Sequence, residues 1–158
     1  MNDVAIGCDP NAADLKEIIK AFLAELGFSC EDYGSVDPIY ANVAIEVCKA
    51  VVAGKHKRGI LICGTGIGMS IAANKVPGAY AALVSDTYSA ERASKSNNAN
   101  IITIGSLVTG PALAKELVAT WMRSEYIPGG SSEPKVQRIR DMDQSLLSGR
   151  GDHERAET

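Results

Sequence analysis

Short apolar runs alternate with longer segments of helical periodicity between Val4 and Arg123, and this alternation constrains the fold more than any other feature. Residues 14–26 place apolar side chains three and four positions apart, as on one face of a helix. Residues 59–63 carry no polar side chain, as in a strand buried on both faces. Such strands, alternating with helices, are typical of a parallel sheet covered on both sides. We therefore predict an α/β fold with a doubly wound, Rossmann-like sheet of five parallel strands in three α/β/α layers.

The bounds of the expected elements follow from the apolar runs and the helical periodicity. Strands are expected at 4–7, 28–33, 59–63, 79–84 and 100–104. Helices are expected at 14–26, 38–53, from the glycine turn to Lys75, and at 87–96, 110–123 and 134–147. The last helix follows the sheet and has basic and acidic faces, so we expect it to contact another subunit. Residues 1–147 are predicted to form one domain, and the polar residues 148–158 a disordered tail.

The composition argues against several classes of protein. A formal net charge of −3 and an aromatic content of 5% disfavour a nucleic-acid-binding surface. No apolar run approaches the roughly 20 residues that cross a bilayer, and the chain starts with no signal-like segment, so a cytoplasmic location is expected. The four cysteines form no C-x-x-C pair and only two histidines are present, so we expect no metal site.

The segment from Cys63 to Gly68 has glycine at three alternate positions between a buried strand and a helix. Glycine permits positive φ, so the backbone N–H groups can converge on one point beside the helix N-terminus. This favours an anion hole for a phosphate or for the negative oxygen of an enediolate. A plain strand-to-helix turn is one alternative. A dinucleotide fingerprint with Asp86 is another, but the spacing is G-x-G-x-G and the motif follows the third strand.

Cys63 comes directly before this glycine loop, where converging amides would stabilise a thiolate. A nucleophilic cysteine normally needs a histidine partner, whereas His56 and His153 fall in a polar loop and in the tail. We therefore favour a base over a nucleophile. The alternative for Cys63 is a buried core cysteine without a chemical role.

Two further side chains stand next to predicted strands. Asp9 follows the first strand, where its carboxylate could bind sugar hydroxyls or cap the next helix, a role that Asn11 could take instead. Asn97 precedes the fifth strand, where its amide could donate to a developing oxyanion or simply form a turn.

With these residues the chain resembles ribose-5-phosphate isomerase B, in the family that also contains the galactose-6-phosphate isomerase subunits. The resemblance extends from about Val4 to about Asp143 and is most specific at residues 62–68 and 72–75. Shorter matches at 7–9, 85–86 and 97–100 support it. It implies an aldose–ketose isomerase of a small phosphorylated sugar that needs no metal or other cofactor. It also implies a homodimer or homotetramer with active sites at the subunit interface.

The resemblance also implies a role for each site residue. Cys63 would be the base that moves a proton between C1 and C2 through a cis-enediolate. Asp9 would hold substrate hydroxyls and help a proton move between the oxygens. The loop that stabilises the enediolate would consist of Gly64, Thr65, Gly66, Ile67 and Gly68, assisted by Asn97.

Several positions depart from the family's pattern. Pro10, a substrate-binding position, stands where the family usually has histidine, and Ser96 stands where it has the ring-opening histidine. Asp37 replaces the tyrosine before Pro38. The arginines that would bind phosphate are replaced by Leu107, Ser131 and Lys135. Lys135, Arg138 and Arg140 are the remaining candidates for the phosphate, and a solvated helix face is the alternative for each.

The lost histidine favours a tetrose 4-phosphate as the substrate. In such a sugar O4 carries the phosphate, so the furanose ring cannot form and needs no acid to open it. Residues 86–93, 96–99 and 39–42 look most like the branch that interconverts erythrulose 4-phosphate and erythrose 4-phosphate. Three alternatives stay open: a ribose 5-phosphate isomerase, a non-catalytic sugar-phosphate-binding subunit, and a nucleotide-binding module.

Overall fold

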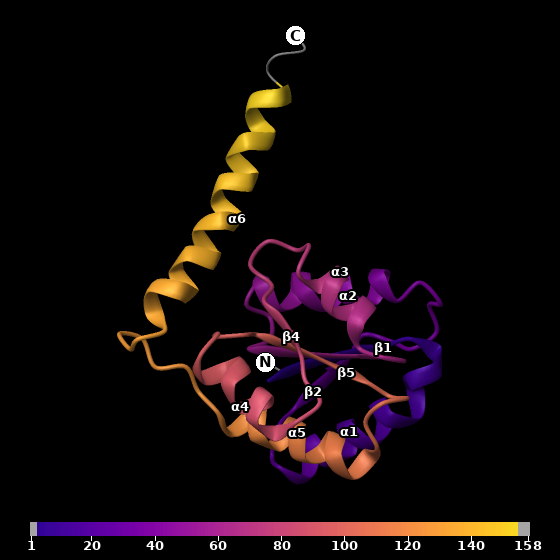
Figure 1. Ribbon diagram of the computed structural model, residues 1–158. Helices are drawn as coiled ribbons and strands as arrows, with labels where there is room; N and C mark the ends of the chain where they lie inside the picture. The colour runs from indigo at the N-terminus through magenta and orange to yellow at the C-terminus, as the bar shows by residue number, and fades with distance from the viewer. Residues whose placement is uncertain (1–2, 155–158) are drawn as a thin grey trace.

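The computed structural model describes residues 3–154, which form a five-stranded sheet with helices on both faces (Figure 1). All strand pairs are parallel, in the order β2-β1-β3-β5-β4. The strands are β1 (Val4–Cys8), β2 (Cys30–Asp32), β3 (Arg58–Cys63), β4 (Ala81–Leu83) and β5 (Ile101–Gly105). The predicted doubly wound α/β sheet is confirmed. The two edge strands, β2 and β4, are shorter than expected because each pairs with one neighbour over only three residues.

The helices cover the two faces of the sheet as the three-layer prediction requires. They are the 3₁₀ helix η1 (Pro10–Ala12), α1 (Ala13–Glu25), α2 (Tyr40–Val52), α3 (Ile67–Ala73), α4 (Thr87–Lys95), α5 (Pro111–Arg123) and α6 (Glu133–Glu154). Helices α1, α4 and α5 cover one face, and α2 and α3 cover the other (Figure 1).

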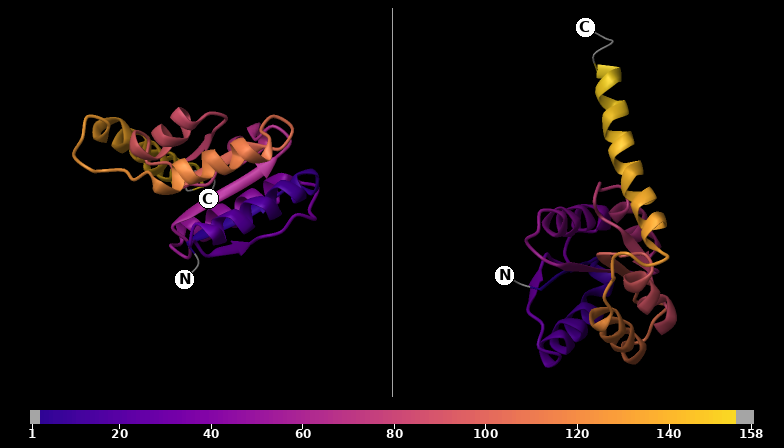
Figure 2. Two further views of the ribbon diagram at one scale, coloured as in Figure 1. Left: turned by 90° about the horizontal axis from the view of Figure 1, so that it is seen from below. Right: turned by 90° about the vertical axis from the view of Figure 1, so that its left-hand side faces the viewer.

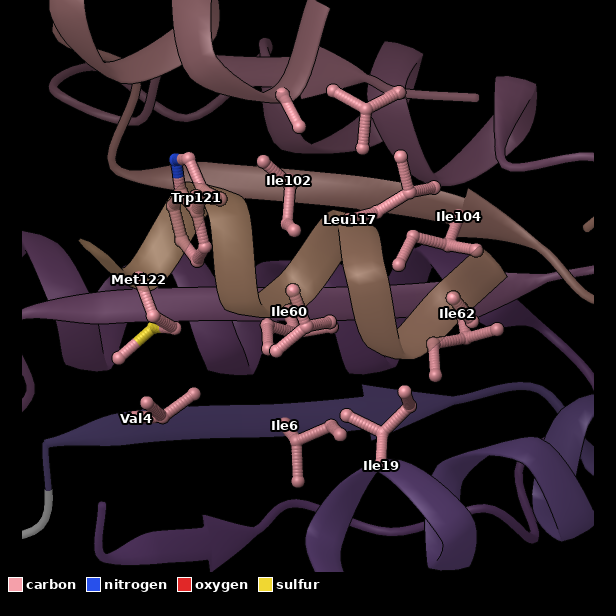
Figure 3. Packing of buried hydrophobic residues seen from close by; sticks show 14 of the residues in the cluster. Val4, Ile6, Ile19, Ile60, Ile62, Ile102, Ile104, Leu117, Trp121 and Met122 are labelled. Atoms are coloured by element: carbon pink, nitrogen blue, oxygen red, sulfur yellow. The ribbon is translucent and has the colours of Figure 1, made fainter. Parts of the chain in front are cut away.

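Two hydrophobic clusters, one on each face, hold the layers together. Alternate residues of the central strands point to opposite faces, so Ile60 and Ile62 pack under α1 and α5 (Figure 3). Leu61 and Cys63 point the other way, toward α2 and α3. The register therefore places Cys63 at the end of β3 on the α2–α3 side of the sheet.

Helix α6 leaves the body of the protein, and its C-terminal half projects away from the sheet (Figures 1 and 2). It continues to Glu154, seven residues beyond the expected end at Leu147. No proline follows Pro134, and Gly149 weakens a helix by about 1 kcal/mol without ending it. The predicted disordered tail thus overlaps the end of α6, and its last four residues lie outside the described part of the chain. Within residues 3–154, no helix has the length and hydropathy that a membrane crossing requires.

Candidate active site

The glycine loop between β3 and α3 needs its glycines for both backbone conformation and close packing. Gly66 has φ of +79° and is the N-cap of α3. A Cβ at this position would lie 2.5 Å from Leu83 Cδ1 and 3.0 Å from the carbonyl carbon of Ile104. A Cβ at Gly105 would lie 2.6 Å from the backbone oxygen of Thr65, and one at Gly68 would clash with the Tyr40 ring. The loop is therefore pressed between the end of β5 and the start of α2.

Several backbone groups of this loop are already bonded. The N–H of Gly66 donates to Cys63 Sγ at 3.1 Å, and that of Ile67 donates to Thr65 Oγ1 at 3.3 Å. The N–H groups of Gly64 and Thr65 make no hydrogen bond with the described residues. These two amides, rather than the whole loop, are free to bind a negative oxygen.

Cys63 is buried in the single chain, with 4% of its surface exposed. Its Sγ accepts the Gly66 N–H, which distinguishes it from the other cysteines. Burial raises the pKa of the Cys8 and Cys30 thiols to about 11, and that of Cys48 to about 12, because desolvation disfavours the thiolate. A Cβ built on Gly64 would contact only the side chain of Leu107, which is 82% exposed.

Asp9 lies beside this end of β3 and also caps a helix. Its N–H donates to the Ile62 carbonyl at 3.1 Å, which places Asp9 next to the strand that carries Cys63. Its Oδ1 accepts the Ala12 N–H at 3.1 Å, so Asp9 and not Asn11 caps η1. The second carboxylate oxygen makes no hydrogen bond among the described residues. Pro10 is exposed at the first position of η1.

Asp86, the acidic residue of the dinucleotide alternative, caps α4 by accepting the Ser89 N–H at 2.7 Å. This bond gives Asp86 a structural role that needs no ribose. Tyr40, which forms the wall against Gly68, entered the sequence analysis only as part of the resemblance at residues 39–42 and was given no role of its own. An aromatic residue at the start of a helix carries no signal of its own.

Asn97 and Cys63 lie at opposite ends of the strands. Asn97 belongs to the turn between α4 and β5, before the first residue of β5, Ile101. Ile101 pairs with Gly59, whereas Cys63 pairs with Gly105. Four residues of parallel strand, roughly 13 Å at the usual rise, separate the two levels. The structure therefore does not bring Asn97 to the glycine loop of the same chain.

The three cations proposed for phosphate binding all lie on α6, near Asn97 rather than Cys63. Lys135 and Arg138 are exposed, and Arg140 is half-buried. Arg140 and Asn97 line one cavity of about 220 Å³ between α6 and β4. The predicted site residues thus form two groups in one chain, one at each end of the strands.

Helix α6 is fixed over this cavity by its buried Val136 and by Asp143. One carboxylate oxygen of Asp143 accepts the Gly78 N–H at 3.0 Å and the Tyr80 hydroxyl at 2.7 Å. Burial, together with this hydrogen bond, raises the pKa of Tyr80 to about 12. Across residues 3–154 no cluster of three or more histidine, cysteine or acidic side chains could hold a metal ion.

Comparison with known proteins places this architecture in one family. The sequence profile of a family described as Ribose/Galactose Isomerase matches residues 4–139. A D-erythrulose-4-phosphate isomerase of Pectobacterium atrosepticum is 50% identical, over 88% of this chain and 93% of that protein. A ribose-5-P isomerase B of Listeria innocua is 46% identical, over 89% of this chain and 97% of that protein.

The fold agrees with the same assignment. The structure of ribose-5-phosphate isomerase B from Clostridium thermocellum superposes with a TM-score of 0.85 at 39% identity, covering 91% of this chain and 99% of that one. The chain therefore belongs to the ribose/galactose isomerase family and is an aldose–ketose sugar-phosphate isomerase.

Proposed function

We propose that the protein interconverts D-erythrulose 4-phosphate and D-erythrose 4-phosphate. The observation that carries this substrate is Ser96, which stands where a ring-opening histidine is expected. Its Oγ lies 3.3 Å from Nη1 of Arg92, and a hydroxyl in this position cannot act as an acid near neutral pH. A tetrose 4-phosphate requires no such acid, because its O4 is esterified and no furanose forms. The similarity to the Pectobacterium atrosepticum isomerase supports the same substrate.

In this mechanism the thiolate of Cys63 takes one proton from C1 of the ketose, giving a cis-enediolate, and returns it to C2 to give the aldose. The negative oxygen is stabilised by the free N–H groups of Gly64 and Thr65 and by the amide of Asn97. The unbonded carboxylate oxygen of Asp9 transfers the second proton between O1 and O2.

The active site in this proposal is made from two subunits. The glycine loop of one subunit and Asn97 of its partner must meet, because within one chain they lie at opposite ends of the strands. Exposed apolar side chains near both groups support such an interface. They are Ile67 and Ile71 on α3, Leu83 on β4, and Ile139, Met142, Leu146 and Leu147 on α6. We therefore propose a homodimer or homotetramer, and a cytoplasmic location stays a prediction.

Steady-state kinetics on two substrates tests this function. Purified protein is assayed with D-erythrulose 4-phosphate and with ribose 5-phosphate, and we expect kcat/KM to be at least tenfold higher for the tetrose. A clear preference for ribose 5-phosphate would show that the pentose is the substrate. The similarity to the ribose-5-P isomerase B of Listeria innocua supports that alternative. Purified homomeric protein that turns over neither sugar would support a non-catalytic subunit instead.

A further inference from the structure

The cavity between α6 and β4 is lined by two polar side chains that make no hydrogen bond or salt bridge with the described part of the chain. Its walls are mostly apolar, and its polar lining consists of Asn74, Tyr80, Asn97 and Arg140. The amide of Asn74 is bonded on both sides to the backbone of Ala81, at 2.9 and 3.0 Å. The hydroxyl of Tyr80 donates to Asp143. Only the amide of Asn97 and the guanidinium of Arg140 make no hydrogen bond or ion pair among residues 3–154.

The other candidate cations are placed less well for an anion in this cavity. Lys135 and Arg138 point from the exposed part of α6, and neither lines the cavity. Arg92 lies near Asn97 in the chain, but its Nη2 donates to Glu91 at 2.7 Å and its Nη1 to Ser96 at 3.3 Å. Arg140 is therefore the half-buried cation that shares a cavity with Asn97 and forms no salt bridge in the described chain, although its charge contributes to lowering the pKa of the Glu133 carboxyl after the hydrogen bonds from Tyr126 and Gly129.

The position of Arg140 is set by contacts on both sides of it along α6. Val136, one turn before, is buried against the cavity wall, and Asp143, one turn after, is bonded to Gly78 and Tyr80. These contacts fix the rotation of the helix, so the side chain at 140 faces the cavity while the one at 138 faces away. A guanidinium held in this way can donate two parallel hydrogen bonds to a phosphate.

We propose that Arg140 binds the phosphate group of the substrate, in the same cavity from which Asn97 reaches the oxygen that becomes negative. This inference rests on the proposed function, because it takes the ligand to be a sugar phosphate. The family's pattern would place phosphate-binding arginines at positions 107, 131 and 135, where this chain has Leu107, Ser131 and Lys135. The proposal assigns the phosphate to a different position. The cation on α6 then fixes one end of the substrate while Cys63 of the partner subunit acts on the other.

Two matched variants, Arg140→Gln and Arg138→Gln, test the proposal. Both remove one positive charge from the same helix, two residues apart. Each is assayed for KM of D-erythrulose 4-phosphate and for competitive inhibition by inorganic phosphate. Because a charged, bidentate contact is lost, we expect Arg140→Gln to raise both constants by about 10- to 100-fold. Arg138→Gln should stay within about twofold of the wild type, and Arg140→Lys should recover part of the loss.

A second readout separates this proposal from the substrate assignment. Inorganic phosphate should raise the unfolding midpoint of the wild-type protein, since a ligand of the native state stabilises it, and this shift should disappear in Arg140→Gln. If the wild type turned over no tetrose phosphate but kept this Arg140-dependent shift, the substrate would be wrong and the phosphate site would stand. Unchanged KM, inhibition and thermal shift in a folded Arg140→Gln protein would overturn the proposal. Loss of the same properties in Arg138→Gln alone would overturn it as well.

Discussion

Replacing Gly66 by alanine should destabilise the protein much more than the same replacement at Gly64, two residues earlier. At φ of +79°, alanine costs about 1–2 kcal/mol relative to glycine. The new Cβ would also lie 2.5 Å from Leu83 Cδ1, 3.0 Å from the Ile104 carbonyl carbon and 3.2 Å from the Gly105 nitrogen. Leu83 is partly exposed and can move, but the two backbone atoms belong to the central strand β5. Overpacking against them adds about 1–3 kcal/mol.

The total for Gly66→Ala is therefore about 2–5 kcal/mol of lost unfolding free energy. For a chain of 158 residues each kcal/mol lowers the thermal midpoint by about 2–4 °C, so we expect a decrease of about 4–20 °C. Gly64→Ala is the control, because its Cβ would meet only Leu107 at an ordinary 3.4 Å. We expect a loss of less than about 1 kcal/mol for this variant.

Thermal and urea unfolding of the wild type and both variants measure the difference, with circular dichroism as the signal. Equal midpoints for Gly66→Ala and Gly64→Ala would refute the reasoning, because they would show that the loop tolerates a side chain where the geometry forbids one. A destabilised Gly64→Ala with a stable Gly66→Ala would refute it more strongly.

Three other outcomes follow from the structure. Iodoacetamide should modify Cys63 before Cys8 or Cys48, because the pKa values of about 11 and 12 keep those two thiols protonated. Bound substrate should slow the modification of Cys63, and mass spectrometry identifies the modified cysteine. Asp143→Asn should weaken the attachment of α6 to the rest of the protein by about 1–3 kcal/mol. Relative to the wild type, hydrogen exchange should become faster in α6 and change less in α5. Asp32 has a pKa lowered to about 2, because hydrogen bonds from two lysines of α1 outweigh the opposing effect of burial. Ionised Asp32 therefore stabilises the folded state by up to about 2 kcal/mol above pH 4, and this contribution is lost as the pH falls toward 2. In Asp32→Asn the free energy of unfolding should depend less on pH over this range.

Much of the fold could be predicted from the chain because its signals are local. The alternation of apolar runs and amphipathic segments predicted all five strands and helices α1 to α5 with bounds within a few residues, whereas the short helix η1 was not predicted. The lengths of β2 and β4 could not be predicted, because they depend on how far each edge strand pairs with its one neighbour. The extension of α6 past Leu147 was missed because polar, glycine-containing segments favour a frayed end.

The sequence pointed to the separate parts of the candidate site but not to how they lie in space. The loop after β3 was identified because glycine at alternate positions has few other uses. Parallel topology explains why Asn97 and the glycine loop lie apart. A turn that leads from a helix into a strand lies at the N-terminal end of the strands, whereas a loop that leads from a strand into a helix lies at their C-terminal end. The choice among Lys135, Arg138 and Arg140 could not be made from charge alone. It depends on the rotation of α6, which Val136 and Asp143 fix through contacts with distant segments.

Deuterium exchange into the substrate tests the role of Cys63 most directly. The wild type and Cys63→Ala are incubated with D-erythrulose 4-phosphate in D₂O, and loss of the C1 proton signal is followed by NMR. We expect exchange at C1 to fall by at least about 100-fold in Cys63→Ala, while its unfolding midpoint stays near that of the wild type. Exchange at an undiminished rate in a folded Cys63→Ala protein would show that another group removes the proton.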